Sequence, residues 1–147
     1  MWLTKSDDLK RVKQFEKETG ITLQRVSLED IGEVEVTGFA ADDNGRARGL
    51  SIRGKKRLRL PALLSKFQRL EKLVLPYNQI SDISSLKELK NLKILYLMAN
   101  KITHMPAEFL NLGLKIKWDI KLEDGIYLAG NPLESPPPTS SSSPNVV

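Results

Sequence analysis

Residues 70–91, LEKLVLPYNQISDISSLKELKN, and residues 92–113, LKILYLMANKITHMPAEFLNLG, are two copies of one 22-residue unit. Eight positions of the first copy return in the second, six at an offset of 22 and the last two at 23. The paired residues are Leu70 and Leu92, Leu73 and Leu95, Leu75 and Leu97, Asn78 and Asn100, Ile80 and Ile102, Ile83 and Met105, Leu86 and Phe109, and Leu89 and Leu112. One such unit cannot bury its own apolar residues, so the sequence predicts several stacked units.

Within each unit the residue types predict a short strand followed by a turn. Leu73 and Leu75 alternate with Lys72 and Val74, which directs the two leucines to one side of a strand and the other residues to the opposite side. The asparagine that follows, Asn78, has an amide that can bond the backbone groups of a turn. Stacking therefore predicts a ladder of asparagine side chains inside successive turns.

With spacing and residue type in agreement at eight positions, this stretch resembles the leucine-rich-repeat family. The resemblance implies an α/β fold, a short solenoid with a parallel sheet on its concave face, and recognition of another molecule through that face. We expect its core to contain the inward residues of four strands, which are Leu50, Ile52, Leu73, Leu75, Leu95, Leu97, Ile126 and Leu128.

The unit before residue 70 is degenerate. Leu50 and Ile52 stand 23 residues before Leu73 and Leu75, but Lys55 occupies the place of the asparagine. Such a departure is expected at a terminal repeat. We expect this turn to lack one side-chain contact of the ladder.

The unit after residue 113 is displaced. The run GIYLAGNPL at 125–133 restores the motif, but Asn131 lies 31 residues after Asn100 rather than 22, so nine residues are inserted. This run and the prolines after it resemble the closing repeat of bacterial and archaeal leucine-rich-repeat proteins, including those that precede Roco-type GTPase modules. No GxxxxGK[ST] loop is present, so the resemblance implies no GTPase activity.

The segment before the repeats predicts a helix and a β-hairpin. Residues 6–19 have an N-capping serine, early acidic residues and a terminal Gly20. Residues 21–26, 34–39 and 47–52 alternate like strands, with Asp43-Asn44-Gly45 as a hairpin turn before the third. The helix either covers the open end of the solenoid or binds a partner, and the first is favoured because terminal repeats need a cover.

These patterns divide the chain into three parts. Residues 1–46 are expected to form an N-terminal cap of a helix and a β-hairpin, residues 47–138 the leucine-rich repeats, and residues 139–147 a disordered tail rich in serine. The chain has no cysteine, no visible secretory signal and no apolar run that approaches the length of a membrane span. We therefore expect a cytoplasmic protein.

The outward strand positions predict a protein-binding surface on the concave face. Val74, Tyr96 and Tyr127 are expected to form one row across the strands, with Pro76, Met98 and Ala129 in the next. Clustered tyrosine, methionine and apolar side chains are typical of partner-binding patches. The candidate partner-binding residues are Arg53, Lys72, Val74, Tyr77, Ile94, Tyr96, Met98 and Tyr127. Because Lys72 and Arg53 would lie at one end, the expected protein or peptide partner is acidic.

A basic segment supplies the alternative function. Ten basic residues and one acidic residue lie between Arg46 and Lys72, although the whole chain has a net charge of only +5. Such a stripe can bind the phosphates of a nucleic acid or an acidic partner. No aromatic residue is interleaved before Phe67, so base-stacking platforms are missing and a solvated edge or an acidic protein contact is favoured.

Catalytic chemistry has little support in the sequence. His104 is the single histidine and stands in a turn, and the paired carboxylates Asp42-Asp43 and Glu29-Asp30 have no implied nucleophile. Metal-ligand spacing is absent, and so is the cysteine that leucine-rich-repeat ubiquitin ligases use. We expect no enzyme, no cofactor, no metal, no small-molecule substrate and no membrane partner.

Overall fold

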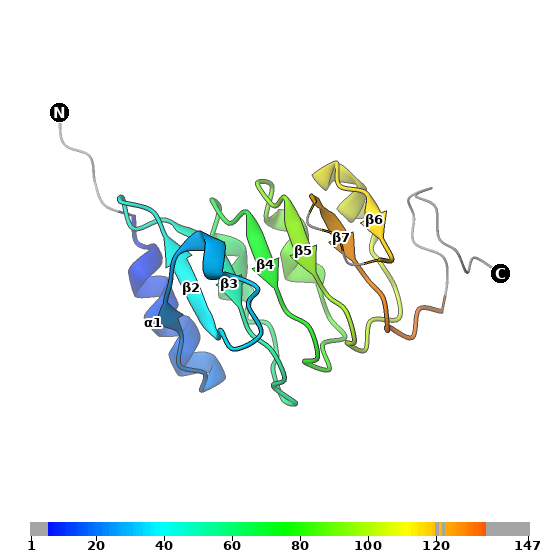
Figure 1. Cartoon of the computed structure of the whole chain (residues 1–147), viewed down its shortest axis with the longest axis horizontal. Coiled ribbons are helices and arrows are strands. Elements are labelled where there is room, and N and C mark those ends of the chain that lie inside the picture. Colours follow the sequence, from blue (N-terminus) through cyan, green and yellow to red (C-terminus); the bar gives the residue numbers. More distant parts are fainter. Residues whose placement is uncertain (1–5, 120, 122, 135–147) are drawn as a thin grey trace.

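The computed structural model describes residues 6–119, 121 and 123–134, so the predicted tail lies outside the described residues. A seven-stranded sheet has the order β1-β2-β3-β4-β5-β7-β6 (Figure 1). The strands are β1 (Gln24–Arg25), β2 (Gly38–Ala41), β3 (Ala47–Ser51), β4 (Lys72–Val74), β5 (Ile94–Tyr96), β6 (Ile116–Lys117) and β7 (Gly125–Tyr127). One α-helix, α1 (Asp8–Thr19), is joined by the 3-10 helices η1 (Leu28–Asp30), η2 (Ala62–Lys66), η3 (Ser84–Glu88) and η4 (Ala107–Leu112).

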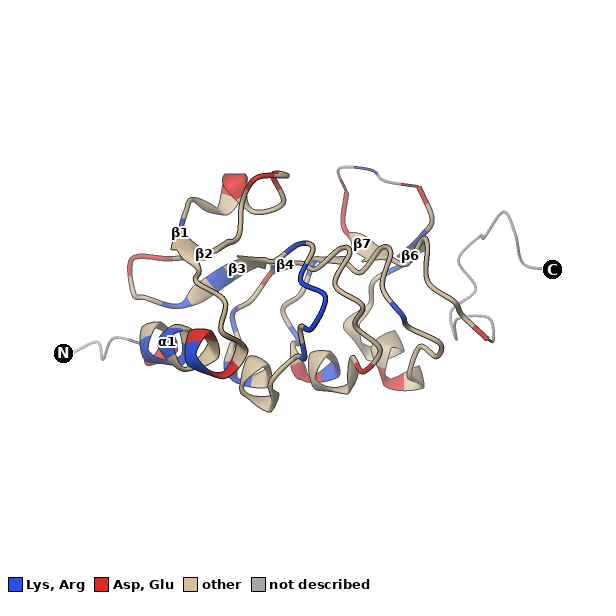
Figure 2. Cartoon of the chain, turned by 90° about the horizontal axis from the view of Figure 1, so that it is seen from below, with Lys and Arg blue, Asp and Glu red and all other residues tan. Residues whose placement is uncertain are grey.

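The repeat strands have the register that the sequence predicts. β3, β4, β5 and β7 are parallel, and Leu50, Leu73, Leu95 and Ile126 are aligned across them. All eight predicted core residues are at most 4% exposed. The helices α1, η2, η3 and η4 lie on one side of the sheet, which is the convex side (Figure 2). The leucine side chains are therefore enclosed between the sheet and these helices.

The asparagine ladder is confirmed. The Lys55 N–H donates to Asn78 Oδ1 at 2.8 Å, and the Asn78 N–H donates to Asn100 Oδ1 at 3.0 Å. The Ile102 N–H donates to Asn131 Oδ1 at 3.0 Å in the same way. Each asparagine amide group also donates to a carbonyl of the preceding repeat or of its own turn. These bonds satisfy backbone groups that leave the sheet where the chain turns.

The N-terminal region contains the predicted helix and hairpin. β2 and β3 are antiparallel, and Gly45 in their turn has φ +75°, which glycine adopts without strain. α1 packs against η2 and buries Phe15 completely. The strand expected at 34–39 begins only at Gly38, and Val34 is 66% exposed. That part of the expectation was wrong, because residues 26–36 follow another path.

Two crossovers pass over the concave face, one at each end of the sheet (Figure 2). β1 is parallel to β2, and β6 is parallel to β7, so in each case the chain must return to the starting end of the sheet. The convex side is already occupied by helices. Residues 26–36, which we call the N-terminal crossover, therefore run over the opposite side. So do the described residues 118, 119, 121, 123 and 124, which we call the C-terminal crossover.

β6 and the C-terminal crossover together accommodate the nine-residue insertion that the sequence indicated. Ile94 pairs with Gly125, 31 residues later, whereas Lys72 pairs with Ile94 at the regular 22. β6 lies outside β7 although it precedes β7 in the chain. No helix in the described part combines the length and apolar character needed to span a bilayer.

Candidate functional site

Part of the concave face is exposed between the two crossovers. We call this part the concave window. It consists of Lys72, Ile94, Tyr96 and Met98, which are all half-buried and come from β4, from β5 and from the residues directly after β5. The predicted row of Val74, Tyr96 and Tyr127 is confirmed by the strand register. Only its central member is open to a partner.

The N-terminal crossover covers Val74. Ile31, Ala40 and Val74 form a buried cluster on the concave side, and Val74 is 3% exposed. A Cβ atom on Gly49 would lie 2.8 Å from side-chain atoms of both Ile31 and Leu28, so the crossover can approach β3 only because residue 49 is glycine. The expectation that Val74 is a surface residue was therefore wrong.

The C-terminal crossover covers Tyr127, which is 1% exposed. The Tyr127 hydroxyl lies 2.8 Å from the Lys121 carbonyl oxygen and 2.7 Å from that of Glu123, and it donates to this backbone. Lys117 Nζ adds an ion pair with Glu123 at 2.8 Å. Tyr127 is thus an anchor for the crossover, and the expectation that it lies at the surface was wrong.

Tyr96 links the window to the C-terminal crossover. Its ring meets the ring of Tyr127 edge-on, with 4.6 Å between the centroids. Its hydroxyl donates to the Lys121 carbonyl at 3.2 Å. Burial raises the pKa of Tyr96, and the neighbouring Tyr127 adds to the rise. The ring is held from two directions, so it loses little rotational freedom if a partner packs against it.

Arg53 and Tyr77 border the window at the carboxyl ends of the strands. The Arg53 guanidinium lies over the Tyr77 ring, 5.2 Å from its centroid, which is a cation–π distance. The Tyr77 N–H donates to the Met98 carbonyl at 3.1 Å, so the tyrosine follows the window directly. Tyr77 is 57% exposed and offers an aromatic surface beside the apolar residues.

The rim of the window is acidic. The exposed carboxylates of the N-terminal crossover are Glu29, Asp30, Glu33 and Glu35, and those of the C-terminal crossover are Asp119, Glu123 and Asp124. Figure 2 shows acidic positions on both crossovers above the sheet. The hydrogen bond and charge of Lys117 lower the pKa of Glu123. A Cβ atom placed on Gly32 would lie only 3.9 Å from Lys72 Nζ. This cation therefore lies against the N-terminal crossover.

The basic segment does not form one continuous stripe. Arg46 and Arg48 pair with Asp42, and Arg48 also contacts Glu71. Burial opposes ionisation of Asp42, but backbone hydrogen bonds from Arg46 and Asn44 and the ion pair with Arg46 hold its pKa below the usual value. Lys55, Lys56, Arg57 and Arg59 lie in the turn after β3 and are a separate group of cations. The predicted phosphate-binding stripe is thus divided between paired and unpaired cations.

The other titratable groups singled out in the sequence make ion pairs or hydrogen bonds within turns. His104 Nε2 lies 3.4 Å from a Glu134 carboxylate oxygen, and both side chains are well exposed. Asp30 accepts a hydrogen bond from the Ser27 hydroxyl, and Asp42 stabilises the hairpin turn. Within the described ranges, no group of three histidine or carboxylate residues is placed to hold a metal ion.

Residues 68–106 match the family model described as "Leucine Rich repeats (2 copies)". The match covers the first regular repeat and the larger part of the second, and it supports a leucine-rich-repeat protein, a class whose domains generally mediate protein–protein interaction and are generally non-catalytic. A search of curated proteins finds no match to the chain.

Sequence reasoning missed the residues that frame the window. Ile31 has no repeat position, and Lys121 and Glu123 act through their carbonyl oxygens, which carry no sequence signal. Two signals were available. Gly49 interrupts an otherwise ordinary strand, and the nine-residue insertion precedes a tyrosine.

Proposed function

We propose that this protein is a non-catalytic protein-interaction module that binds a peptide segment of its partner at the concave window. The observation that carries the proposal is the half-buried patch of Ile94 and Tyr96 on β5 and Met98 just after it, with a crossover on each side. An apolar patch with a tyrosine at its centre is typical of an interaction hot spot. The class of the matching family supports the same function.

The surroundings favour a partner that carries basic residues beside an apolar anchor. Seven exposed carboxylates lie on the two crossovers, whereas Lys121 is the single basic residue among residues 26–36 and 118–124. Arg53 already lies over Tyr77, and Lys72 lies against the N-terminal crossover. Complementary charge speeds association and selects among partners. The acidic partner expected from Lys72 and Arg53 is therefore not the one that this window favours.

The remaining parts of the chain fit this role. We propose residues 1–46 as a cap, because α1 and the hairpin cover the core at β3, and residues 47–138 as the repeat domain, since β3 begins at Ala47. We further propose a cytoplasmic protein of the bacterial or archaeal type, on the basis of the cysteine-free composition and the closing run 125–133.

A selection of random peptides displayed on phage tests this function. We expect the immobilised protein to enrich peptides with a large apolar residue flanked by lysine or arginine. An Ile94→Asp variant should lose these peptides. A Leu110→Asp variant should keep them, because Leu110 is 49% exposed on η4 at the convex side. Equal binding by both variants, with both folded, would reject the concave window.

A further inference from the structure

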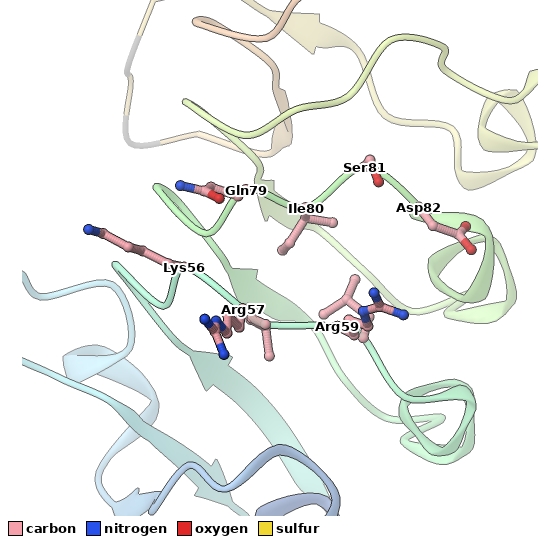
Figure 3. Close-up of a pocket in the computed structure, with 9 residues that line it drawn as sticks. Lys56, Arg57, Arg59, Gln79, Ile80, Ser81 and Asp82 are labelled. Carbon is pink, nitrogen blue, oxygen red and sulfur yellow. The ribbon is translucent and has the colours of Figure 1, made fainter.

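A groove of about 770 Å³ lies between the first two repeats, away from the concave window. Lys56, Arg57 and Arg59 lie along one side, and residues 79–82 lie along the other (Figure 3). Its volume is within the range that proteins use for ligand sites. Neither the paired arginines of the hairpin nor the window residues line this groove.

The groove is open because the end of the first turn forms a hydrogen bond within the turn rather than with the next repeat. Between the second and third repeats, the Ile80 N–H donates to Asn100 Oδ1 and the Lys101 N–H donates to the Ile80 carbonyl. At the first turn, the Leu58 N–H donates instead to the Lys55 carbonyl at 3.2 Å. The first turn runs from Ile52 to Leu58 and the second from Leu75 to Ile80. Their starting residues are 23 apart but their final residues are only 22 apart, so the first turn is one residue longer. The two chain segments that line the groove therefore separate after Asn78, where the ladder joins them.

The cations on the first turn are available to a ligand. Lys55, Lys56, Arg57 and Arg59 are all exposed, and no ion pair within the described ranges involves any of them. The one carboxylate that lines the groove, Asp82, accepts hydrogen bonds from the Ser84 N–H at 3.0 Å and the Ser84 hydroxyl at 2.7 Å. These bonds lower its pKa. Asp82 is thus an ionised carboxylate engaged with η3, and it faces three cations, so the groove lining has a net positive charge.

We propose that this inter-repeat groove binds an acidic peptide segment, as a second interaction site of opposite charge to the concave window. Side-chain carboxylates of the segment face Lys56, Arg57 and Arg59, and Gln79 and Ser81 offer hydrogen bonds on the other side. A neutral or basic residue of the segment faces Asp82. No aromatic residue lines the groove, so it lacks the stacking surface that single-stranded nucleic acids use. This inference does not depend on the function proposed for the window.

The test uses a short fluorescent oligoglutamate peptide and two matched variants. The first replaces Lys56, Arg57 and Arg59 by alanine. The second replaces Lys10, Lys13 and Lys17, exposed lysines of α1, by alanine, which lowers the net charge by the same amount. At low ionic strength the groove variant should bind the peptide about tenfold more weakly than the α1 variant, since each exposed ion pair contributes modestly.

A reporter in the groove gives an independent readout. Because the chain has no cysteine, Ser81→Cys can be labelled at one position with an environment-sensitive dye. Binding of oligoglutamate should change its fluorescence, and thermal melts should show that all variants remain folded. Equal loss in both charge variants, or no binding at low ionic strength, would overturn the proposal. Tighter binding of a single-stranded RNA through the same three cations would also overturn it and assign the groove to nucleic acid.

Discussion

Each ladder asparagine both accepts and donates hydrogen bonds through one short side-chain amide. The Asn100 side chain is 2% exposed and accepts hydrogen bonds from the backbone N–H groups of Asn78 and Ile80. The same amide donates to carbonyl groups of Leu75 and Leu97. One side chain therefore serves the donors and acceptors of two successive turns. The spacing of the asparagines was sufficient to predict this function, because the contacts repeat with the unit.

Replacing Asn100 by alanine should lower the free energy of unfolding by about 1–3 kcal/mol, because buried backbone groups lose their partners. Asn111 is exposed and outside the ladder, so Asn111→Ala is the control and should have little effect. Urea-induced unfolding followed by circular dichroism measures both. Similar losses at the two positions would contradict the assignment of the ladder.

Asp8 makes a long-range contact that its local sequence does not indicate. In the sequence it is an acidic residue in the first turn of a helix, where the helix dipole favours it. In the structure it is 3% exposed, and its Oδ2 accepts a hydrogen bond from the Ala47 N–H, 39 residues away, at 2.8 Å. Contacts of this kind join the helix to β3 and have no local pattern, so they could not be predicted.

At the scale of elements, the parallel repeats were predictable and the two crossovers were not. The sequence indicated the nine-residue insertion and the hairpin turn, but not which face the connecting segments would cover. That choice depends on which face the helices already occupy, and this is a property of the packed molecule. Residues 34–39 alternate like a strand because Val34, Val36 and Phe39 are separated by polar residues or glycine, yet residues 34–36 belong to the N-terminal crossover.

The C-terminal crossover should depend on a single hydroxyl group. Tyr127→Phe keeps the ring contact with Tyr96 but removes the donor to the carbonyl groups of Lys121 and Glu123. We expect faster amide hydrogen exchange in the described residues of the C-terminal crossover, with a loss of global stability of only about 1 kcal/mol. Tyr77→Phe is the matched control, since the Tyr77 ring is exposed. Unchanged exchange in the crossover of the Tyr127 variant would argue against the anchor.

At the scale of the whole molecule, few repeats share one core. The buried cluster extends without interruption from Val12 in α1 to Leu128 after β7. In a repeat fold each unit is stabilised by its neighbours, so damage to a central repeat weakens the whole array. The molecule is also divided by charge, with acidic crossovers over the concave face and a group of unpaired cations in the first turn (Figure 2). This division supports two binding surfaces of opposite preference.

A cavity in the central repeat should therefore destabilise the entire chain. Leu97→Ala removes a completely buried side chain and should cost about 2–5 kcal/mol. Because domains are typically stable by about 5–15 kcal/mol, the thermal midpoint should fall markedly in one transition. Leu110→Ala, at an exposed position, is the control. A melt in which the two variants behave alike would reject the core assignment.

Site-specific crosslinking tests the binding surface most directly. In this cysteine-free chain, Met98→Cys places a photoreactive label in the concave window and Leu110→Cys places the same label on the convex side. Each labelled protein is irradiated with a selected peptide that carries an apolar anchor and basic flanks. Binding at the concave window predicts a crosslinked product from position 98 and none above background from position 110. Equal yields, or a product from position 110 alone, would contradict it.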